Sequence, residues 1–351
     1  MLSILIPTRN RWGFLGRLLR HYSHFGMPYP IFIGDSSDPD QCLESESVLK
    51  EVSGRLNVDV RLYPGVSNLA TGLDLLERVS TPYVVSTADD DFLVVRGVRK
   101  AMDFLEEYPD YSTAHGDAIL FSVSDDKPYG RLTSVGRYPQ HSVERECGAK
   151  RLMEHLKAYK PTVHSVHRTD HLRDSYRRVI ELKMDNNFGE LAPSCIPTIR
   201  GKVKKLKTLY MVRQAHADMT SRKTSPKVFD WITTAGWPEQ WARFSDCLSE
   251  EIVRQDKISA DEARQAVQRA FWMFLAKALT LKWHVTHGVR EGLASSWLES
   301  PWRIPDPRKV WEKAQAFLSG EGAELSLKTV LQPPSPHHAD FMPIYQTITS
   351  L

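Results

Sequence analysis

Residues 83–92 read YVVSTADDDF, an apolar run of strand-forming residues that ends at three consecutive aspartates. The β-branched and aromatic residues of this run favour a buried strand. In an extended segment, Asp89 and Asp91 would point to one side and Asp90 to the other. Three adjacent carboxylates repel one another, so a folded protein keeps them solvated or neutralises them with a cation. The end of this strand is therefore our first candidate for a functional site.

The chain on both sides of this stretch alternates short apolar runs with amphipathic segments, a pattern typical of strands connected by crossover helices. The pattern predicts further strands at residues 2–6, 31–34, 58–63 and 118–123. It predicts helices at residues 13–22, 68–79 and 95–107, and it places the arginines of the first helix on its polar face. Residues 145–178 are strongly basic and mixed in type, and within them only residues 164–168 predict an element, a strand.

Polar side chains also follow two other predicted strands at the point where each strand ends. The first strand runs into residues 7–11 (PTRNR), and the second runs into residues 35–37 (DSS). Open α/β sheets bind ligands at the carboxyl ends of their strands. A carboxylate such as Asp35 can accept hydrogen bonds from a base or a ribose hydroxyl, and Arg9 or Arg11 can pair with a phosphate. The three strand ends are expected to line one rim.

The segments SILIPTRNR, IFIGDSSD and TPYVVSTADDDF occur in this order, with Ala70-Thr71-Gly72 in the helix that precedes the last of them. Together they resemble the nucleotide-binding half of GT-A fold glycosyltransferases of the family 2-like group, especially a bacterial branch with unassigned acceptor. The resemblance covers residues 1–125 well and thins toward residue 220. It implies an α/β fold, a GT-A type Rossmann-like mixed sheet flanked by helices, with a mainly helical C-terminal region.

The resemblance also implies roles for the residues at the strand ends. In that family the loop after the first strand and the aspartate after the second hold the nucleotide, which corresponds to Pro7, Thr8, Arg9 and Asp35 here. The acidic motif of the family holds a divalent metal on the diphosphate, which corresponds to Asp89 and Asp91. Carboxylate oxygens suit Mg²⁺ or Mn²⁺, which one or two carboxylates usually hold together with substrate phosphates.

Two residues near the end of the expected catalytic domain complete this metal and diphosphate site. His216 resembles the late histidine that several GT-A enzymes supply as a further metal ligand, and imidazole suits Mn²⁺ better than Mg²⁺. Arg213 and Arg11 can neutralise the diphosphate as it leaves. A lone histidine is, however, more often a structural residue, and that reading stays open for His216.

The catalytic base is where this sequence departs from the family pattern. Inverting members place an acidic pair at a helix start about a hundred residues after the metal motif, whereas Gly189-Glu190 stands here. One carboxylate is enough to take the proton from an acceptor hydroxyl in a single displacement. We expect Glu190 to be this base, with Asp185 as the reserve candidate.

These expectations combine into a metal-dependent, inverting glycosyltransferase with a nucleotide-sugar donor. Its acceptor is expected to be a glycan or a lipid-linked hydroxyl, in bacterial surface polysaccharide or glycoconjugate synthesis. Two alternatives stay open: a sugar-phosphate nucleotidyltransferase, although residues 8–13 contain only one glycine to embrace a triphosphate, and a non-catalytic interaction protein on the same scaffold. No G-x-G-x-x-G or P-loop motif occurs, which excludes dehydrogenase and P-loop assignments.

Composition narrows the partners and the compartment. A formal charge of +3 over 351 residues gives no reason to expect a nucleic-acid partner. Four cysteines without a CxxC pair fit a reducing compartment, so we expect a cytoplasmic protein. No apolar segment reaches the roughly 20 residues of a membrane span. The lysines of residues 202–207 predict a solvated face, and they leave open a peripheral association with the inner face of the cell membrane.

The sequence predicts two regions, a catalytic domain at residues 1–220 and a mainly helical region at residues 221–351. The second region contains eight of the nine tryptophans, which are expected to lie mostly in its core. Ser259 and Glu262 have the spacing of a capping box ahead of a long helix. The proline-rich tail from Gln332 predicts an extended arm. Acceptor binding, packing and a homodimer contact all remain open as roles of this region.

Overall fold

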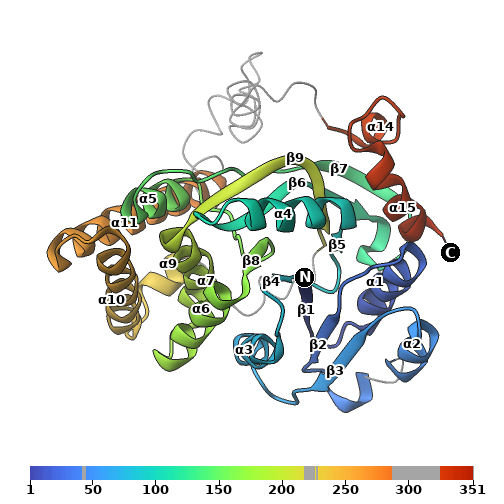
Figure 1. The fold of residues 1–351 in the computed structure, drawn as a ribbon, viewed down its shortest axis with the longest axis horizontal. Coiled ribbons are helices and arrows are strands. Elements are labelled where there is room, and N and C mark those ends of the chain that lie inside the picture. The colour runs from blue at the N-terminus through green and yellow to red at the C-terminus, as the bar shows by residue number, and fades with distance from the viewer. Residues whose placement is uncertain (42–44, 217–225, 227, 287–324, 351) are drawn as a thin grey trace.

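The computed structural model describes residues 1–41, 45–216, 226, 228–286 and 325–350, and its centre is a nine-stranded mixed sheet (Figure 1). The strands follow the order β3-β2-β1-β4-β8-β6-β9-β5, and β7 pairs with β6 off this path. The strands are β1 (Leu2–Thr8), β2 (Ile31–Asp35), β3 (Val58–Leu62), β4 (Tyr83–Ser86), β5 (Phe92–Leu93), β6 (Tyr111–Val123), β7 (Leu132–Tyr138), β8 (Val166–Arg168) and β9 (Lys202–Gln214). All the strands predicted from the sequence are present.

Successive side chains of β1 pack in two different apolar layers, because neighbouring residues of a strand point to opposite faces. Ile4 packs with residues of α1 and α2, whereas Leu5 packs with residues of α3. The helices of this half are α1 (Trp12–Phe25), α2 (Ser45–Val52), α3 (Asn68–Arg78) and α4 (Val95–Glu107), with short 3₁₀ turns at η1 (Pro39–Gln41) and η2 (Ser124–Asp126). The sheet is therefore covered by helices on both faces, as the sequence predicted.

The three aspartates connect two distant parts of the sheet. β4 pairs with β1 on one side and with β8 on the other. β5, which follows the aspartates directly, instead pairs antiparallel with β9, and Phe92 lies opposite Val212. The connection from β4 to β5 therefore crosses from the middle of the sheet to its end.

Residues 145–178, within which the sequence predicted only a strand at residues 164–168, form a helix, a short strand and a second helix. These are α5 (Gly148–Lys157), β8 and α6 (Thr169–Glu181). β8 has only three residues and lies antiparallel between β4 and β6. The strand predicted at residues 164–168 is therefore present, and both of its partner strands lie far away in the sequence.

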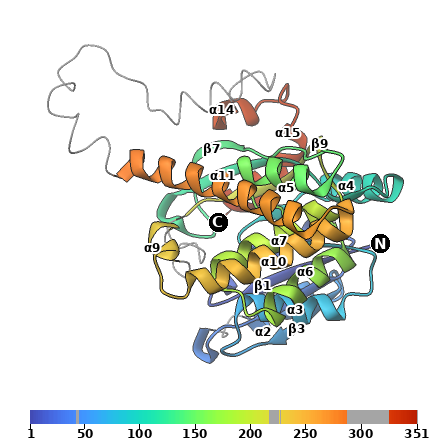
Figure 2. The same cartoon turned by 90° about the vertical axis from the view of Figure 1, so that its left-hand side faces the viewer.

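A second core forms between helices from both halves of the chain (Figure 2). It joins α5 and α7 (Asn186–Arg200) to α9 (Val228–Ile232), α10 (Trp237–Asp256) and α11 (Ala260–Thr286). Aromatic rings fill its centre, where Phe188 stacks on Phe244 at 4.6 Å and Trp241 stacks on Phe271 at 4.4 Å. The predicted capping box is present, since Ser259 Oγ accepts from the main-chain N–H of Glu262. The proposed division near residue 220 stays a prediction.

The tryptophans of the C-terminal region are placed unequally. Trp231 is buried, and Trp237 and Trp241 pack against the helical core. Trp272 is 48% exposed and does not belong to the core. The side chains of Trp283, Trp297, Trp302 and Trp311 lie outside the described residues.

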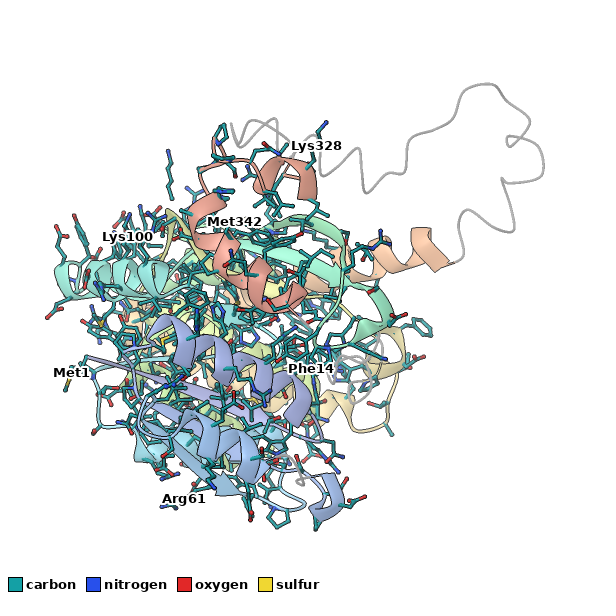
Figure 3. The ribbon with its side chains drawn as sticks, turned by 90° about the vertical axis from the view of Figure 1, so that its right-hand side faces the viewer. Met1, Phe14, Arg61, Lys100, Lys328 and Met342 are labelled. Carbon is teal, nitrogen blue, oxygen red and sulfur yellow. The ribbon has the colours of Figure 1, made fainter. Side chains whose placement is uncertain are left out.

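The prediction of an extended C-terminal arm is wrong. The tail forms α14 (Leu327–Val330) and α15 (His338–Thr349), and α15 packs against α1 (Figures 1 and 3). Phe341, Ile344 and Ile348 of α15 are buried at helical spacing. The prolines that suggested an arm lie in the turn before α15, so they set the start of the helix.

None of the described helices combines the length and the apolar character that a bilayer crossing requires.

Candidate active site

The ends of β1, β2 and β4 lie side by side, as predicted. Thr8 at the end of β1 is in register with Asp35 at the end of β2. On the other side of β1, the main-chain N–H of Thr87 donates to the carbonyl of Leu5 at 2.9 Å. The parallel arrangement therefore brings the polar residues that follow the three strands to one rim.

The acidic segment is a turn, and not the extended segment that the alternation argument assumed. The chain turns at Asp89 and Asp90, and the N–H of Asp91 donates back to the carbonyl of Ala88 at 3.3 Å. Arg11 Nη2 donates to Asp90 Oδ2 at 2.7 Å, and Arg11 Nε lies 3.2 Å from Asp89 Oδ1. The expectation that Asp90 points away from Asp89 is therefore wrong, because both carboxylates share the Arg11 guanidinium.

Asp89 and Asp91 each have a further partner. Asp89 Oδ2 accepts a 2.7 Å hydrogen bond from the Thr8 hydroxyl. Asp91 Oδ2 accepts a 2.8 Å hydrogen bond from Arg213 Nε of β9. Residues predicted from the first strand end and from the end of the catalytic domain thus meet at the acidic turn.

His216 joins the turn through Asp90 rather than through the two aspartates predicted as metal ligands. Its Nε2 lies 2.7 Å from Asp90 Oδ2 and 3.0 Å from Arg11 Nη2. Its ring stacks on Phe14 with the centroids 5.2 Å apart. In this structure His216 therefore positions Asp90, a residue that the sequence analysis left without a role.

The environment acts differently on the three carboxyl groups. Burial raises the pKa of Asp89 and of Asp91, although Arg11 and Arg213 respectively oppose that shift. Burial also disfavours ionised Asp90, but the hydrogen bond from His216 and the charge of Arg11 hold its pKa well below the usual range. The three carboxyl groups thus differ in how readily each is ionised, with Asp90 the most acidic.

Arg17 was missed by the sequence analysis, which placed the arginines of the first helix on the solvent face. Its side chain is fully buried and donates to the carbonyl of Asp90 at 2.9 Å and to Gln214 Oε1 at 2.6 Å. The N–H of Gln214 in turn donates to Asp91 Oδ1 at 3.2 Å. Arg17 therefore holds the acidic turn and the end of β9 together from behind.

Of the residues predicted to contact the nucleotide, some lie at the rim as expected and one points elsewhere. Asp35 is buried, and its carboxylate accepts from Trp12 Nε1 at 2.7 Å and from the N–H of Ser37 at 2.8 Å. Pro7 is half-buried within β1. Arg9 is exposed, and its guanidinium lies 3.9 Å from Asp38 rather than at the acidic turn.

The two candidate bases lie at the start of α7 in different environments. Asp185 caps the helix, since its Oδ1 accepts from the N–H of Phe188 and its Oδ2 accepts from Trp231 Nε1, both at 2.8 Å. Both of its oxygens are engaged, which favours a structural role. Glu190 is exposed, and the surrounding protein raises its pKa while the nearby charge of Arg213 opposes the shift. The charge of Arg213 therefore acts on both Glu190 and Asp91.

The donor set of the acidic turn fits a shared metal site better than a protein-only metal cage. Its carboxylate oxygens are the hard ligands that Mg²⁺ and Mn²⁺ prefer. Within the described part of the chain, however, no group of three or more His, Cys, Asp or Glu side chains is arranged to hold a metal ion. The described residues therefore do not form a complete metal site by themselves, and an ion here would need further ligands from a bound molecule.

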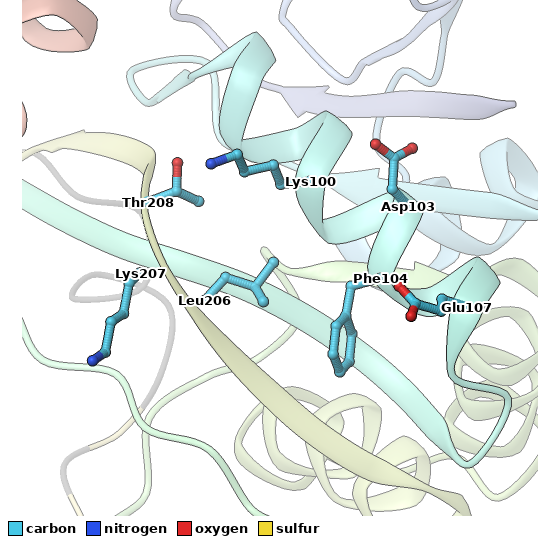
Figure 4. Close-up of a pocket in the computed structure, with 7 residues that line it drawn as sticks. All are labelled: Lys100, Asp103, Phe104, Glu107, Leu206, Lys207 and Thr208. Carbon is cyan, nitrogen blue, oxygen red and sulfur yellow. The ribbon is translucent and has the colours of Figure 1, made fainter.

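A separate groove of about 320 Å³ lies between α4 and β9 (Figure 4). Lys100 and Phe104 line it from α4, and Lys207 lines it from β9. None of the residues at the acidic turn contributes to it, so it is distinct from the candidate active site.

Comparison with known proteins gives information on the fold. No family model matches the chain, and a search of curated proteins finds no match either. Among solved structures, S. aureus TarS residues 1–349 in complex with UDP-GlcNAc matches at 11% identity and a TM-score of 0.54, over 82% of this chain and 76% of that chain. Another structure of S. aureus TarS 1–349 matches at 13% identity and a TM-score of 0.49, over 82% and 75% of the two chains. The match to the UDP-GlcNAc complex confirms the predicted α/β fold of GT-A-type glycosyltransferases.

Proposed function

We propose that this protein is a glycosyltransferase that transfers a sugar from a nucleotide-sugar donor to an acceptor hydroxyl. The observation that carries the proposal is the acidic turn, which stands at the carboxyl ends of parallel strands with Thr8, Arg11 and Arg213 bonded to it. Open α/β sheets bind their ligands at this place. The TarS structure that shares the fold contains UDP-GlcNAc, which supports a nucleotide-sugar ligand for this chain as well.

Different residues of the rim would contact different parts of the proposed donor. The segment around Pro7 and Thr8 and the buried Asp35 would contact the nucleoside. Arg9 lies at the exposed edge of the same rim and is suited to an outer phosphate. Arg11 and Arg213 carry positive charge to the diphosphate, which accumulates negative charge as the bond to the sugar breaks.

A divalent cation would be held by Asp89 and Asp91, with His216 beside them as the proposed additional ligand. When bound, Mn²⁺ or Mg²⁺ supplies positive charge to the leaving diphosphate. His216 bonds to Asp90, and all four carboxylate oxygens of Asp89 and Asp91 already have protein partners, so coordination by any of these residues requires a change of partner. Arg11 and Arg213 occupy these carboxylates and would shift to the phosphate oxygens when the donor binds.

Glu190 is the proposed general base of a single-displacement reaction. The acceptor oxygen attacks the anomeric carbon, the bond from that carbon to the diphosphate oxygen breaks, and the acceptor proton passes to the Glu190 carboxylate. The nucleoside diphosphate leaves from the opposite side, so the anomeric configuration is inverted. Asp185 is less suited to this role because its oxygens already cap α7.

We also propose a glycan or lipid-linked acceptor, in bacterial surface polysaccharide or glycoconjugate synthesis, at the cytoplasmic face of the membrane. The lysines of β9 are the basic residues considered for membrane contact. Several of them already pair with acidic neighbours, including Lys204 with Glu144 at 2.8 Å and Lys205 with Asp117 at 3.1 Å. A membrane contact would therefore depend on the positive charge that these ion pairs do not neutralise.

Calorimetric titration with UDP-GlcNAc and a panel of other nucleotide sugars, each with Mn²⁺, with Mg²⁺ and with EDTA, tests the proposal. We expect at least one nucleotide sugar to bind, and the divalent ion to tighten the binding at least tenfold. Asp91→Asn tests the proposed metal ligand in the same titration. Asp103→Asn, at an exposed position of α4, is its matched control. If none of the nucleotide sugars binds the wild-type protein under any condition, the proposal is wrong and an interaction protein becomes the better assignment.

A further inference from the structure

A small cavity lies where β6, α5 and the segments next to α5 meet. His115 lines it from β6 and His155 from α5. Gln140, His141 and Val143 line it from the segment before α5, and Lys160 and Thr162 line it from the segment after α5. None of these side chains belongs to the proposed active site.

The polar atoms at this cavity are left without partners by the protein itself. The Nε2 atoms of the three histidines, together with Gln140 Oε1 and Thr162 Oγ1, are buried and have no hydrogen-bond partner. His115 and His155 are each only 1% exposed, and Thr162 is 5% exposed. Native proteins seldom leave buried polar atoms unpaired, and a group of such atoms around one space indicates a bound polar ligand.

The other ring nitrogen of His115 is already engaged, which fixes the ring in place. His115 Nδ1 lies 3.1 Å from the Ser165 hydroxyl. The His155 ring packs edge-on against Tyr159 at 5.3 Å. These contacts limit the freedom of both imidazoles to turn their Nε2 atoms toward another protein group.

The size and chemistry of the cavity select its ligand. The cavity offers about 10 Å³ to the centres of water-sized molecules, which is close to the minimum for one water molecule. Burial lowers the pKa values of His115 and His155 to about 3, so these imidazoles are neutral at pH 7, and a volume that admits only one water-sized molecule excludes a polyatomic anion beside Lys160. The described residues also include no cluster of three or more potential ligands arranged for a metal ion. A single neutral polar molecule fits best.

We propose that this cavity is the binding site of one ordered water molecule held by the three imidazoles, the Gln140 amide and the Thr162 hydroxyl. A water molecule donates two hydrogen bonds and accepts two, so it can pair with up to four of these five atoms. Gln140 Oε1 can only accept, which assigns it one of the water protons. The imidazoles supply an N–H or a lone pair according to their tautomers.

The water connects the sheet to a turn that approaches the active site. The carbonyl of Thr162 lies 2.7 Å from His167 Nε2 of β8. The main-chain N–H of Thr162 donates to Ser194 Oγ of α7. Two residues later, His164 Nδ1 lies 3.0 Å from the carbonyl of Ser86, the last residue of β4. The water site therefore fixes the turn at residues 162–165 between β6, α5 and α7.

A crystal structure of the full chain at about 1.6 Å resolution, with diffraction data at the zinc absorption edge, tests the proposal. We expect one density peak with at least three of the five polar atoms at hydrogen-bond distance and no anomalous signal. An empty cavity overturns the proposal. A peak with anomalous signal, supported by a stoichiometric metal content of the purified protein, overturns it as well and assigns a metal ion instead.

Two variants of His155 give an independent measurement. His155→Gln keeps a polar end near the water and is expected to retain the density peak. His155→Leu removes one partner and is expected to lose or weaken the peak and to lower Tm by about 2–4 °C more than His155→Gln does. His24→Leu, at an exposed histidine of α1, controls for the loss of an imidazole. If His155→Leu is as stable as His155→Gln and binds the water equally well, His155 does not hold it.

Discussion

The guanidinium of Arg17 donates a 2.9 Å hydrogen bond to the main-chain carbonyl of Asp90, so a fully buried cation lies directly behind the acidic turn. Burial lowers the pKa of Arg17 to about 10, while the three aspartates act against that shift, so the side chain stays charged at neutral pH. The acidic turn is therefore bracketed by arginines, with Arg17 behind it and Arg11 and Arg213 at its open side. Removal of any one of these three arginines would leave the acidic turn without one of its counter-charges.

Arg17→Met is expected to destabilise the protein by about 3–5 kcal/mol, because it leaves the acidic turn without its buried counter-charge. The matched control is Arg20→Met, three residues further along α1. Arg20 is partly exposed and pairs with Glu51 on the surface, so its loss should cost no more than about 1 kcal/mol. Urea unfolding of both variants measures the difference. Equal stability of the two variants would show that the Arg17 contacts contribute nothing net.

Asp91→Ala is expected to lower kcat/KM for sugar transfer by about 10³-fold or more while the fold is retained, because the variant loses a proposed metal ligand and the partner of Arg213. Transfer is measured as release of the nucleoside diphosphate with the donor that the binding experiment identifies. Asp103→Ala provides the control for loss of a carboxylate. Wild-type turnover by Asp91→Ala would remove this aspartate from the proposed mechanism.

Glu190→Gln is expected to lower kcat by about 10²–10⁴-fold with little change in donor affinity, because the variant cannot accept the proton of the acceptor. Since the protein raises the pKa of Glu190, the acidic limb of the wild-type rate profile should lie at a higher pH than for an ordinary carboxylate. Glu181→Gln, at an exposed position of α6, is the control. Loss of donor binding in Glu190→Gln would contradict the role of base.

Stability is expected to fall as the pH drops below about 6.5. Burial lowers the pKa of six described histidines to about 3 or 4, namely His21, His115, His155, His164, His167 and His171. Between these values and the unfolded value near 6.5, the unfolded chain binds more protons than the native chain. Each such group therefore contributes a loss of up to about 1.4 kcal/mol per pH unit.

Two aspartates act in the opposite direction over part of this range. The pKa values of Asp89 and Asp91 are raised to about 7 and about 6, so at these positions the native chain binds protons before the unfolded chain does. The six histidines outnumber them, and the net effect is destabilisation by acid. Urea unfolding at pH 7.5, 6.5 and 5.5 measures how the free energy of unfolding changes with pH. His171→Gln should reduce this change by the contribution of about one proton. A protein more stable at pH 5.5 than at pH 7.5 would contradict this account.

Gly97→Ala is expected to destabilise the protein by about 1–3 kcal/mol, because an added Cβ would lie 2.2 Å from the carbonyl oxygen of Leu209. This glycine lets α4 approach the backbone of β9, the strand that carries Arg213. Gly136→Ala in β7 is the control, since its Cβ would meet no atom within 4 Å. Thermal unfolding of the two variants gives the comparison. Equal Tm values would show that α4 can move away from β9 without cost.

The sequence predicted those parts of the fold that depend on local pattern. The apolar runs and the polar residues at their ends gave β1, β2 and β4 and the rim that they share. Arg17 was placed wrongly because helical periodicity assigns charged residues to the solvent face. In the structure its buried guanidinium donates a hydrogen bond to the carbonyl of Asp90. Only the tertiary structure brings these two groups together.

Other errors came from giving one signal too much weight. The alternation argument for Asp90 assumed an extended chain, but a turn brings Asp90 to His216. The prolines after Gln332 suggested an arm, although Phe341, Ile344 and Ile348 have the spacing of a buried helix face and would have predicted α15. The helices α5 and α6 were not predicted, because the many basic residues of positions 145–178 obscured their apolar spacing, whereas the strand β8 between them was.

The connection from β4 to β5 has a consequence for biosynthesis. All three aspartates leave the ribosome more than a hundred residues before β9, and β9 supplies both the strand that pairs with β5 and the arginine that binds Asp91. A nascent chain that ends before Gln214 thus contains every carboxylate of the site but cannot hold the third one in place. The acidic turn therefore gains its full set of partners only after β9 has been synthesised.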